Sequence, residues 1–243
     1  MGYELTYKPY GNHVVLIEWP QKIDENILND ILQFKNLLLE NSIKQIVDII
    51  NAYNSLTIIY SSDIENIYTE ISALKALYIR VKPLQNETYV CWKIPVCYDL
   101  GFGIDILGLA AKKDCSPQQL VKLHTAKDYL VYFIGFLPGF LYMGGLDKML
   151  HAPRKENPRL MVPKGSVAIG GSQTGVYPVD SAGGWQIIGN SPLSFFDIKK
   201  ENPCFAKPGD RIRFYSVDLE EYKKIRLLME AGIYMLESEV MDA

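Results

Sequence analysis

The side chains best suited to bind a polar ligand gather between Gly135 and Asp197, where glycine, proline, arginine and aromatic residues are dense. Glycine lets the backbone adopt a positive φ or approach a ligand closely, and proline restricts the conformations of a loop. Arginine offers a planar guanidinium to a carboxylate or a phosphate. This combination predicts a preorganised polar pocket.

Arg154 and Arg159 are the candidate anion-binding residues of this stretch. Each follows a proline, and they lie five residues apart on a predicted loop, so both side chains could converge on one anionic group of a substrate. The alternative is a pair of solvated surface arginines.

Gln173, Thr174 and Tyr177 are candidate donors around a substrate carbonyl, in the manner of an oxyanion pocket. We predict catalytic roles for Gln173 and Tyr177 and a substrate-binding role for Thr174, although the chemistry of a hairpin turn explains the same residues equally well. Trp185 follows two glycines and is a candidate stacking wall for a small ring or a planar base. A tryptophan buried in a barrel is the alternative.

His124 is a candidate catalytic residue at the end of a short helix. Ser116 as N-cap, Pro117 at the first helical position and Gln119 three residues after the cap predict where that helix begins. Imidazole titrates near neutral pH, so His124 could act as a general acid or base, or donate to a phosphate. The alternative is a histidine that faces the carbonyl end of its helix.

Several common catalytic signatures are absent from the chain. There is no GxxxxGK[ST] phosphate loop, no GxSxG nucleophile elbow and no kinase-type glycine loop. The glycine-rich run 170–175 is followed by Val176, where a phosphate loop would need lysine. The three histidines and four cysteines lack the paired spacing of a zinc site, so we predict no metal site and free thiols.

The composition is that of an ordinary globular enzyme. Of the 243 residues, 48% are hydrophobic and 22% are charged, and the formal net charge of −3 offers no basic face to nucleic acid. Neither a signal peptide nor an apolar run of membrane-spanning length occurs in the sequence. We therefore expect a cytoplasmic protein with neither a nucleic-acid partner nor a membrane partner.

The first part of the chain alternates short strands with amphipathic helices. Strands are predicted at 3–8, 13–19, 43–50, 55–60 and 87–94, and helices at 24–39, with Asp24 as N-cap, and 63–79. Two helices on one side of an antiparallel sheet are typical of a ferredoxin-like α+β domain, which we place at residues 1–86.

The remainder, residues 87–243, contains many short strands between Gly/Pro turns. Strands are predicted at 129–134, 166–170, 176–179, 185–188, 193–197 and 211–216, and helices at 104–111, after Ser116 and at 219–231. This pattern predicts a barrel or a sandwich.

The order of motifs across this second part resembles a known family. The pieces GFLPGF, the two Pro-Arg pairs, VPKGSVAIGG, QTGVYP, GGWQIIG and PGDRIRF are similar to the carboxyltransferase C/D-type domain of the family of 5-oxoprolinase B subunits and KipI, which includes allophanate hydrolase subunit 1. Leu141 departs from this pattern, since the family often has proline there. The resemblance implies a cyclophilin-like β-barrel for the second domain, after a smaller α+β domain.

The resemblance also implies a function. It predicts the B subunit of an ATP-dependent 5-oxoprolinase, which opens 5-oxoproline to L-glutamate together with subunits A and C and with Mg²⁺-ATP in the assembled complex, and which is inactive alone. It favours the anion-binding interpretation of Arg154 and Arg159. Two alternatives stay open: a KipI-type inhibitor of sensor histidine kinase autophosphorylation, and a subunit of allophanate hydrolase or urea carboxylase.

Overall fold

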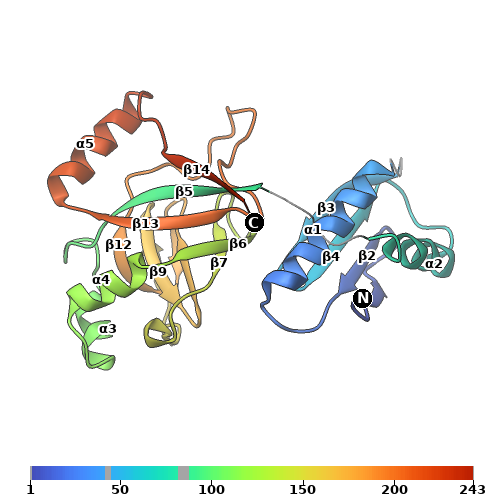
Figure 1. Cartoon of the computed structure of the whole chain (residues 1–243), viewed down its shortest axis with the longest axis horizontal. Coiled ribbons are helices and arrows are strands. Elements are labelled where there is room, and N and C mark those ends of the chain that lie inside the picture. The colour runs from blue at the N-terminus through green and yellow to red at the C-terminus, as the bar shows by residue number, and fades with distance from the viewer. Residues whose placement is uncertain (1, 42–44, 82–87, 243) are drawn as a thin grey trace. The chain divides into compact units, whose positions relative to one another are not determined.

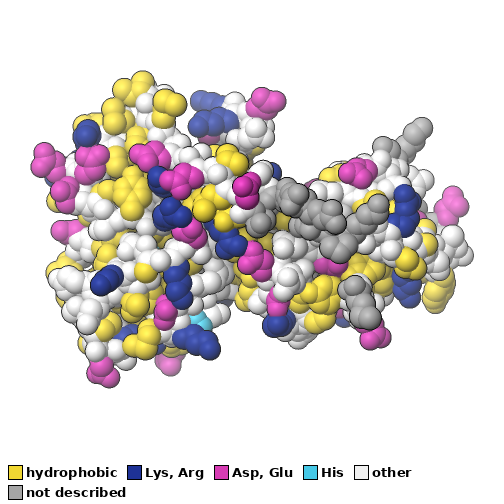
Figure 2. Space-filling view, in the orientation of Figure 1, with side chains coloured by type: hydrophobic (Ala, Val, Ile, Leu, Met, Phe, Trp, Pro, Cys, Tyr) yellow, Lys and Arg dark blue, Asp and Glu magenta, His cyan; other side chains and the backbone are white. Residues whose placement is uncertain are grey.

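The chain forms two compact units, residues 1–87 and 88–243. A computed structural model describes residues 2–41, 45–81 and 88–242 (Figure 1). The α+β unit followed by a mainly-β barrel confirms the predicted fold class. On the face shown in Figure 2, basic and acidic side chains are interspersed over both units.

The first unit is a four-stranded antiparallel sheet with two helices. Its elements are β1 (Thr6–Pro9), β2 (Val14–Glu18), α1 (Glu25–Glu40), β3 (Ile46–Asn51), β4 (Ser55–Tyr60) and α2 (Ile67–Tyr78), and the strand order is β1-β2-β4-β3. Asp24 caps α1 as predicted, because its side chain accepts a hydrogen bond from the Asn26 N–H at 2.9 Å. Apolar positions of α1, such as Ile31 and Phe34, pack on sheet residues such as Ile17 and form the core of this unit.

The second unit is a seven-stranded barrel with an eighth strand attached. Its elements are β5 (Thr88–Cys97), α3 (Ile106–Lys112), α4 (Pro117–Thr125), β6 (Asp128–Ile134), β7 (Leu141–Gly144), η1 (Lys148–Leu150), β8 (Arg159–Val162), β9 (Ser166–Gly170), β10 (Gln173–Val176), β11 (Ser181–Gly183), β12 (Gln186–Asn190), β13 (Arg211–Val217), α5 (Leu219–Glu230) and β14 (Ser238–Asp242). The strands follow the order β12-β9-β10-β7-β6-β13-β5, and pairing of β12 with β5 closes the barrel. Strand β14 pairs with β5, and β8 and β11 form a separate two-stranded ribbon.

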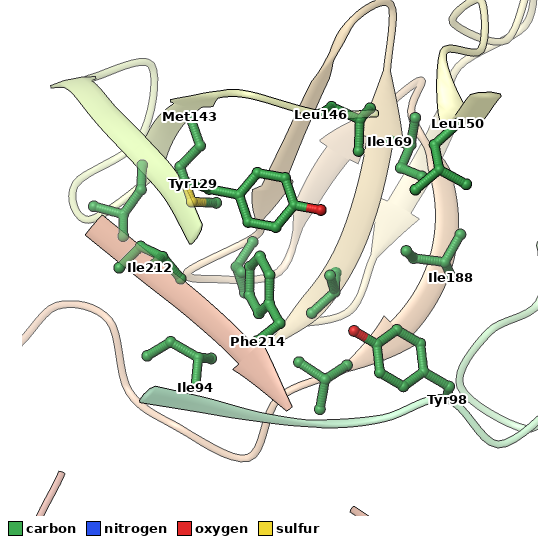
Figure 3. Close-up of a cluster of buried hydrophobic side chains, with 14 of the residues drawn as sticks. Ile94, Tyr98, Tyr129, Met143, Leu146, Leu150, Ile169, Ile188, Ile212 and Phe214 are labelled. Atoms are coloured by element: carbon green, nitrogen blue, oxygen red, sulfur yellow. The ribbon is translucent and has the colours of Figure 1, made fainter. Parts of the chain in front are cut away.

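The barrel interior is filled by side chains that alternate along its strands. Figure 3 shows Ile94, Tyr129, Met143, Ile169 and Phe214 converging in this core. Because neighbouring residues of a strand point to opposite faces, each strand places every second side chain inside the barrel and the others outside.

Two strand predictions were wrong in position, and a third was wrong only in its sheet. The strand predicted at 87–94 is observed as β5, but all its partners are strands of the second unit, so it does not complete the sheet of the first unit. The strand predicted at 176–179 lies earlier, in β10, and the run 193–197 is not a strand. Leu193 and Phe195 are nevertheless buried in the barrel core, so this irregular segment packs against the barrel through its apolar side chains.

Candidate functional site

The predicted site residues of β10 divide between the two faces of the barrel wall. Thr174 and Val176 point into the barrel, whereas a Cβ on Gly175 would contact Phe140 and Trp185 outside it. Tyr177 belongs to the same outer cluster as Trp185. Gln173 lies opposite Gly170 in the register of β9 and β10, and a Cβ on Gly170 would meet the Trp185 ring. Gln173, Tyr177 and Trp185 therefore share the outer face, and Thr174 does not.

Inside the barrel, His124 joins a chain of hydrogen bonds. Its Nδ1 lies 2.7 Å from the Tyr98 hydroxyl and its Nε2 lies 2.8 Å from Oγ1 of Thr174, which in turn donates to the Ala168 carbonyl at 3.1 Å. Because the single hydroxyl proton of Thr174 is used on Ala168, the Thr174 oxygen must accept from His124, which makes Nε2 the protonated nitrogen. Tyr98 then donates to Nδ1.

The environment of His124 holds it neutral. The side chain is 0% exposed, and its ring stacks on Phe214 with centroids 4.8 Å apart. Burial lowers the pKa of His124 from its ordinary 6.5 to about 3. Both ring nitrogens already have partners, so the geometry suits a residue that fixes strand β10 in place from inside the barrel.

Outside the barrel, Trp185 is the centre of an aromatic cluster. The indole is 5% exposed, packs against the bare backbone of Gly170 and Gly175, and meets Phe140 edge-on with centroids 5.6 Å apart. Burial raises the pKa of Tyr177, although a hydrogen bond with the Trp185 backbone opposes this shift, so the phenol stays protonated at neutral pH.

Arg154 and Arg159 both lie near this outer cluster, but they differ in exposure and in ion pairing. Arg154 is exposed, and its guanidinium carbon lies over the Trp185 ring, 5.7 Å from the centroid. Arg159 lies at the start of β8 and is already paired, since its Nη2 is 2.6 Å from Asp105 Oδ1. The structure thus places Arg154 beside Tyr177 and Trp185 with its charge open to solvent, and it ties Arg159 to an internal carboxylate.

Asp105 is a central residue of this region that sequence reasoning missed. Its carboxylate also pairs with Lys155 at 3.0 Å and accepts the Ile187 N–H at 2.8 Å. Burial opposes ionisation, but the bonds from Arg159, Ile187 and Lys155 outweigh it and hold the pKa of Asp105 below its usual range. No short motif signals this role, because the partners lie far along the chain and meet Asp105 only in the folded barrel.

The described residues also lack two other features. Within them, no group of three or more His, Cys, Asp or Glu side chains is arranged to hold a metal ion. Nor does any helix in the ranges 2–41, 45–81 and 88–242 have both the length and the apolar character needed to cross a membrane. The four cysteines are free.

Comparison with known proteins identifies relatives over most of the chain. The family profile of the carboxyltransferase domain, subdomain C and D, matches residues 5–206. The chain is 41% identical over 169 residues to the 5-oxoprolinase B subunit of Escherichia coli O157:H7, an alignment that covers 70% of this chain and 77% of that protein. It is 32% identical over 224 residues to the 5-oxoprolinase B subunit of Bacillus subtilis (strain 168), covering 87% of this chain and 92% of that protein.

Solved structures agree with this grouping. The crystal structure of TTHA0988 matches with a TM-score of 0.73 and 30% identity over 84% of this chain, which corresponds to only 40% of that longer chain. The Kluyveromyces lactis urea amidolyase matches with a TM-score of 0.84 over 99% of this chain and 16% of its own, and at 19% identity this likeness concerns the fold alone. The chain therefore belongs to the family of the carboxyltransferase domain, subdomain C and D, which it shares with the bacterial 5-oxoprolinase B subunits.

Proposed function

We propose that this chain is the B subunit of an ATP-dependent 5-oxoprolinase, which opens 5-oxoproline to L-glutamate together with subunits A and C. The observation that carries the proposal is the 32% identity to the Bacillus subtilis B subunit over 92% of that protein, which extends through both units of the present chain. The E. coli relative, at 41% identity, supports the same assignment.

The outer face of the barrel supplies side chains of the types that this chemistry requires. Opening an unactivated lactam needs a cation for the substrate carboxylate and donors for the oxygen that becomes negatively charged. In our proposal Arg154 binds the carboxylate, the Gln173 amide and the Tyr177 phenol stabilise the oxyanion, and Trp185 forms the wall behind the ring. His124 and Thr174 act indirectly, because their hydrogen bonds hold β10 from inside the barrel.

The nucleotide part of the reaction is assigned to no residue of this chain. Mg²⁺ prefers carboxylate and other oxygen ligands, and no cluster of three potential ligands of the Asp, Glu, His or Cys type occurs in the part of the chain that the structure describes. In the proposal the partner subunits therefore complete the site, and this chain has little or no activity alone.

Reconstitution tests the proposed function. The full chain should be purified alone and combined with subunits A and C from the same genome, and glutamate formed from 5-oxoproline should be measured with and without ATP. We expect turnover only in the complete mixture and only with ATP. Robust turnover by the single chain would refute the need for partners, and turnover of urea or allophanate instead of 5-oxoproline would reassign the substrate.

A further inference from the structure

A second feature of the barrel unit borders the outer aromatic cluster through the ion pairs of Asp105. A cavity of about 350 Å³ separates one face of α3 from the segment that precedes β8. Lys112 and Lys113 line it from the end of α3, and Asp105, Lys155 and Gln186 also line it. A volume of this size is at the lower end of the range found for small-molecule sites.

The charge of the cavity is positive. Asp105 is the only carboxylate among its lining residues, and that carboxylate is already engaged by Arg159 and Lys155. Lys113 donates to the His151 carbonyl, which fixes its ammonium group at the wall. The ammonium group of Lys112 is exposed, and no hydrogen bond or ion pair to it occurs within the described residues.

Gly108 is an exposed residue of α3 that also lines this cavity. It occupies the third position of α3, where glycine costs about 1 kcal/mol of helix stability relative to alanine. Its φ is not positive, and a Cβ added to it would meet no atom within 4 Å. Neither the backbone nor the packing of the protein requires glycine here, so a side chain can be added at this position beside the cavity.

We propose that this cavity binds a phosphate-bearing small molecule, with the phosphoryl oxygens held by Lys112, Lys113 and Lys155. Three lysine ammonium groups act as compact point charges, so together they favour a multiply charged phosphate over a singly charged carboxylate, and the neighbouring Arg159 is occupied by Asp105. The inference concerns the chain by itself and does not rest on the 5-oxoprolinase assignment.

Calorimetric titration of the full chain tests the proposal, with pyrophosphate as the probe and malonate as a carboxylate of similar size. We expect saturable binding of pyrophosphate and binding of malonate at least about tenfold weaker. Lys112→Gln should weaken pyrophosphate binding about tenfold, the loss expected for one charge-assisted contact. Lys122→Gln is the matched control, since Lys122 is an exposed lysine in the last turn of α4 and does not line the cavity, and it should bind as the parent does.

Gly108→Leu tests the space rather than the charge. The added side chain enters the open cavity, so pyrophosphate binding should be lost while the melting temperature stays the same or rises. A parallel titration with ADP identifies the source of the phosphate: tighter binding than pyrophosphate indicates a nucleotide, and equal binding indicates recognition of the phosphate group alone. No saturable pyrophosphate binding up to about 10 mM, equal binding of malonate, or equal losses in Lys112→Gln and Lys122→Gln would each overturn the proposal.

Discussion

Acidification should destabilise the barrel unit through His124 in a pH range where the carboxylates contribute little. The pKa of His124 is about 3 in the folded barrel, against 6.5 for an ordinary histidine. Because the folded value is the lower one, the unfolded chain takes up a proton near pH 6.5 that the folded chain refuses. The stabilising contribution is therefore complete above pH 6.5 and is lost as the pH falls from 6.5 toward 3.

The expected magnitude follows from the difference in proton uptake. As the pH falls by about 1.5 units, from 6.5 to 5, protonation of His124 lowers the free energy of the unfolded state. At 1.36 kcal/mol per pH unit this amounts to about 2 kcal/mol. That is a large share of the stability of an ordinary domain. Asp105 and Asp128, whose pKa values are lowered by their partners, begin to contribute only nearer to their ordinary value of 3.8.

Urea unfolding at pH 7, 6 and 5 measures this effect. In a Trp19→Phe background, fluorescence of Trp92 and Trp185 reports the barrel unit alone. His124→Gln should lose about 1–3 kcal/mol at pH 7, because it leaves the buried Tyr98 hydroxyl unpaired, but its stability should change less between pH 7 and 5. His13→Gln, which lies outside the barrel unit, is the control substitution and should leave the barrel's unfolding curves unchanged. If His124→Gln and the parent lose the same free energy over this range, the buried neutral histidine is not the cause.

The remaining predictions concern the outer face of the barrel. Arg154→Lys should lower kcat/KM of the reconstituted enzyme about tenfold, because lysine lacks the planar guanidinium that a carboxylate prefers. The free energy of unfolding should stay unchanged, and parental kinetics would show that Arg154 does not belong to the site. Arg159→Lys should instead destabilise the barrel by about 1 kcal/mol in urea unfolding, because it weakens a largely buried ion pair with Asp105. The loss is limited because Lys155 still pairs with the Asp105 carboxylate, and unchanged stability would mean that Lys155 alone is enough to hold that carboxylate. Gly170→Ala should displace the Trp185 indole, whose atoms lie about 2.5 Å from the added Cβ, and should cost about 1–3 kcal/mol with a shift in tryptophan fluorescence. Gly108→Ala, which adds a Cβ in open space within α3, should instead stabilise the protein by up to about 1 kcal/mol.

The elements with strong local chemistry were predictable from the sequence. Asp24 and the Ser116 capping box mark helix starts that the structure confirms, because a cap depends only on residues within one turn. The strand at 166–170 was predicted at its observed bounds, since a run of small and β-branched residues between two turns has few alternatives. The short strands β7, β8 and β11 were missed because pairing with distant segments, and not a local pattern of residues, makes these segments strands.

The grouping of site residues needed the fold. Gln173 and Thr174 were predicted to serve one pocket, but strand alternation sends them to opposite faces of the wall, and glycine in QTGVY obscures the period-two pattern that would have revealed it. Asp105 escaped notice for a different reason: Arg159 and Ile187 reach it from 54 and 82 residues away. Sequence spacing cannot report such contacts.

The coupling of ATP hydrolysis to ring opening tests the proposed function most directly. Subunits A and C should be incubated with 5-oxoproline and ATP, with and without this chain, while ADP and glutamate are measured together. Our account predicts that adding the chain produces both products in equal amounts and that omitting it abolishes glutamate formation. Equal glutamate formation in its absence, or ADP formation without glutamate in its presence, would contradict the assignment of this chain as the B subunit.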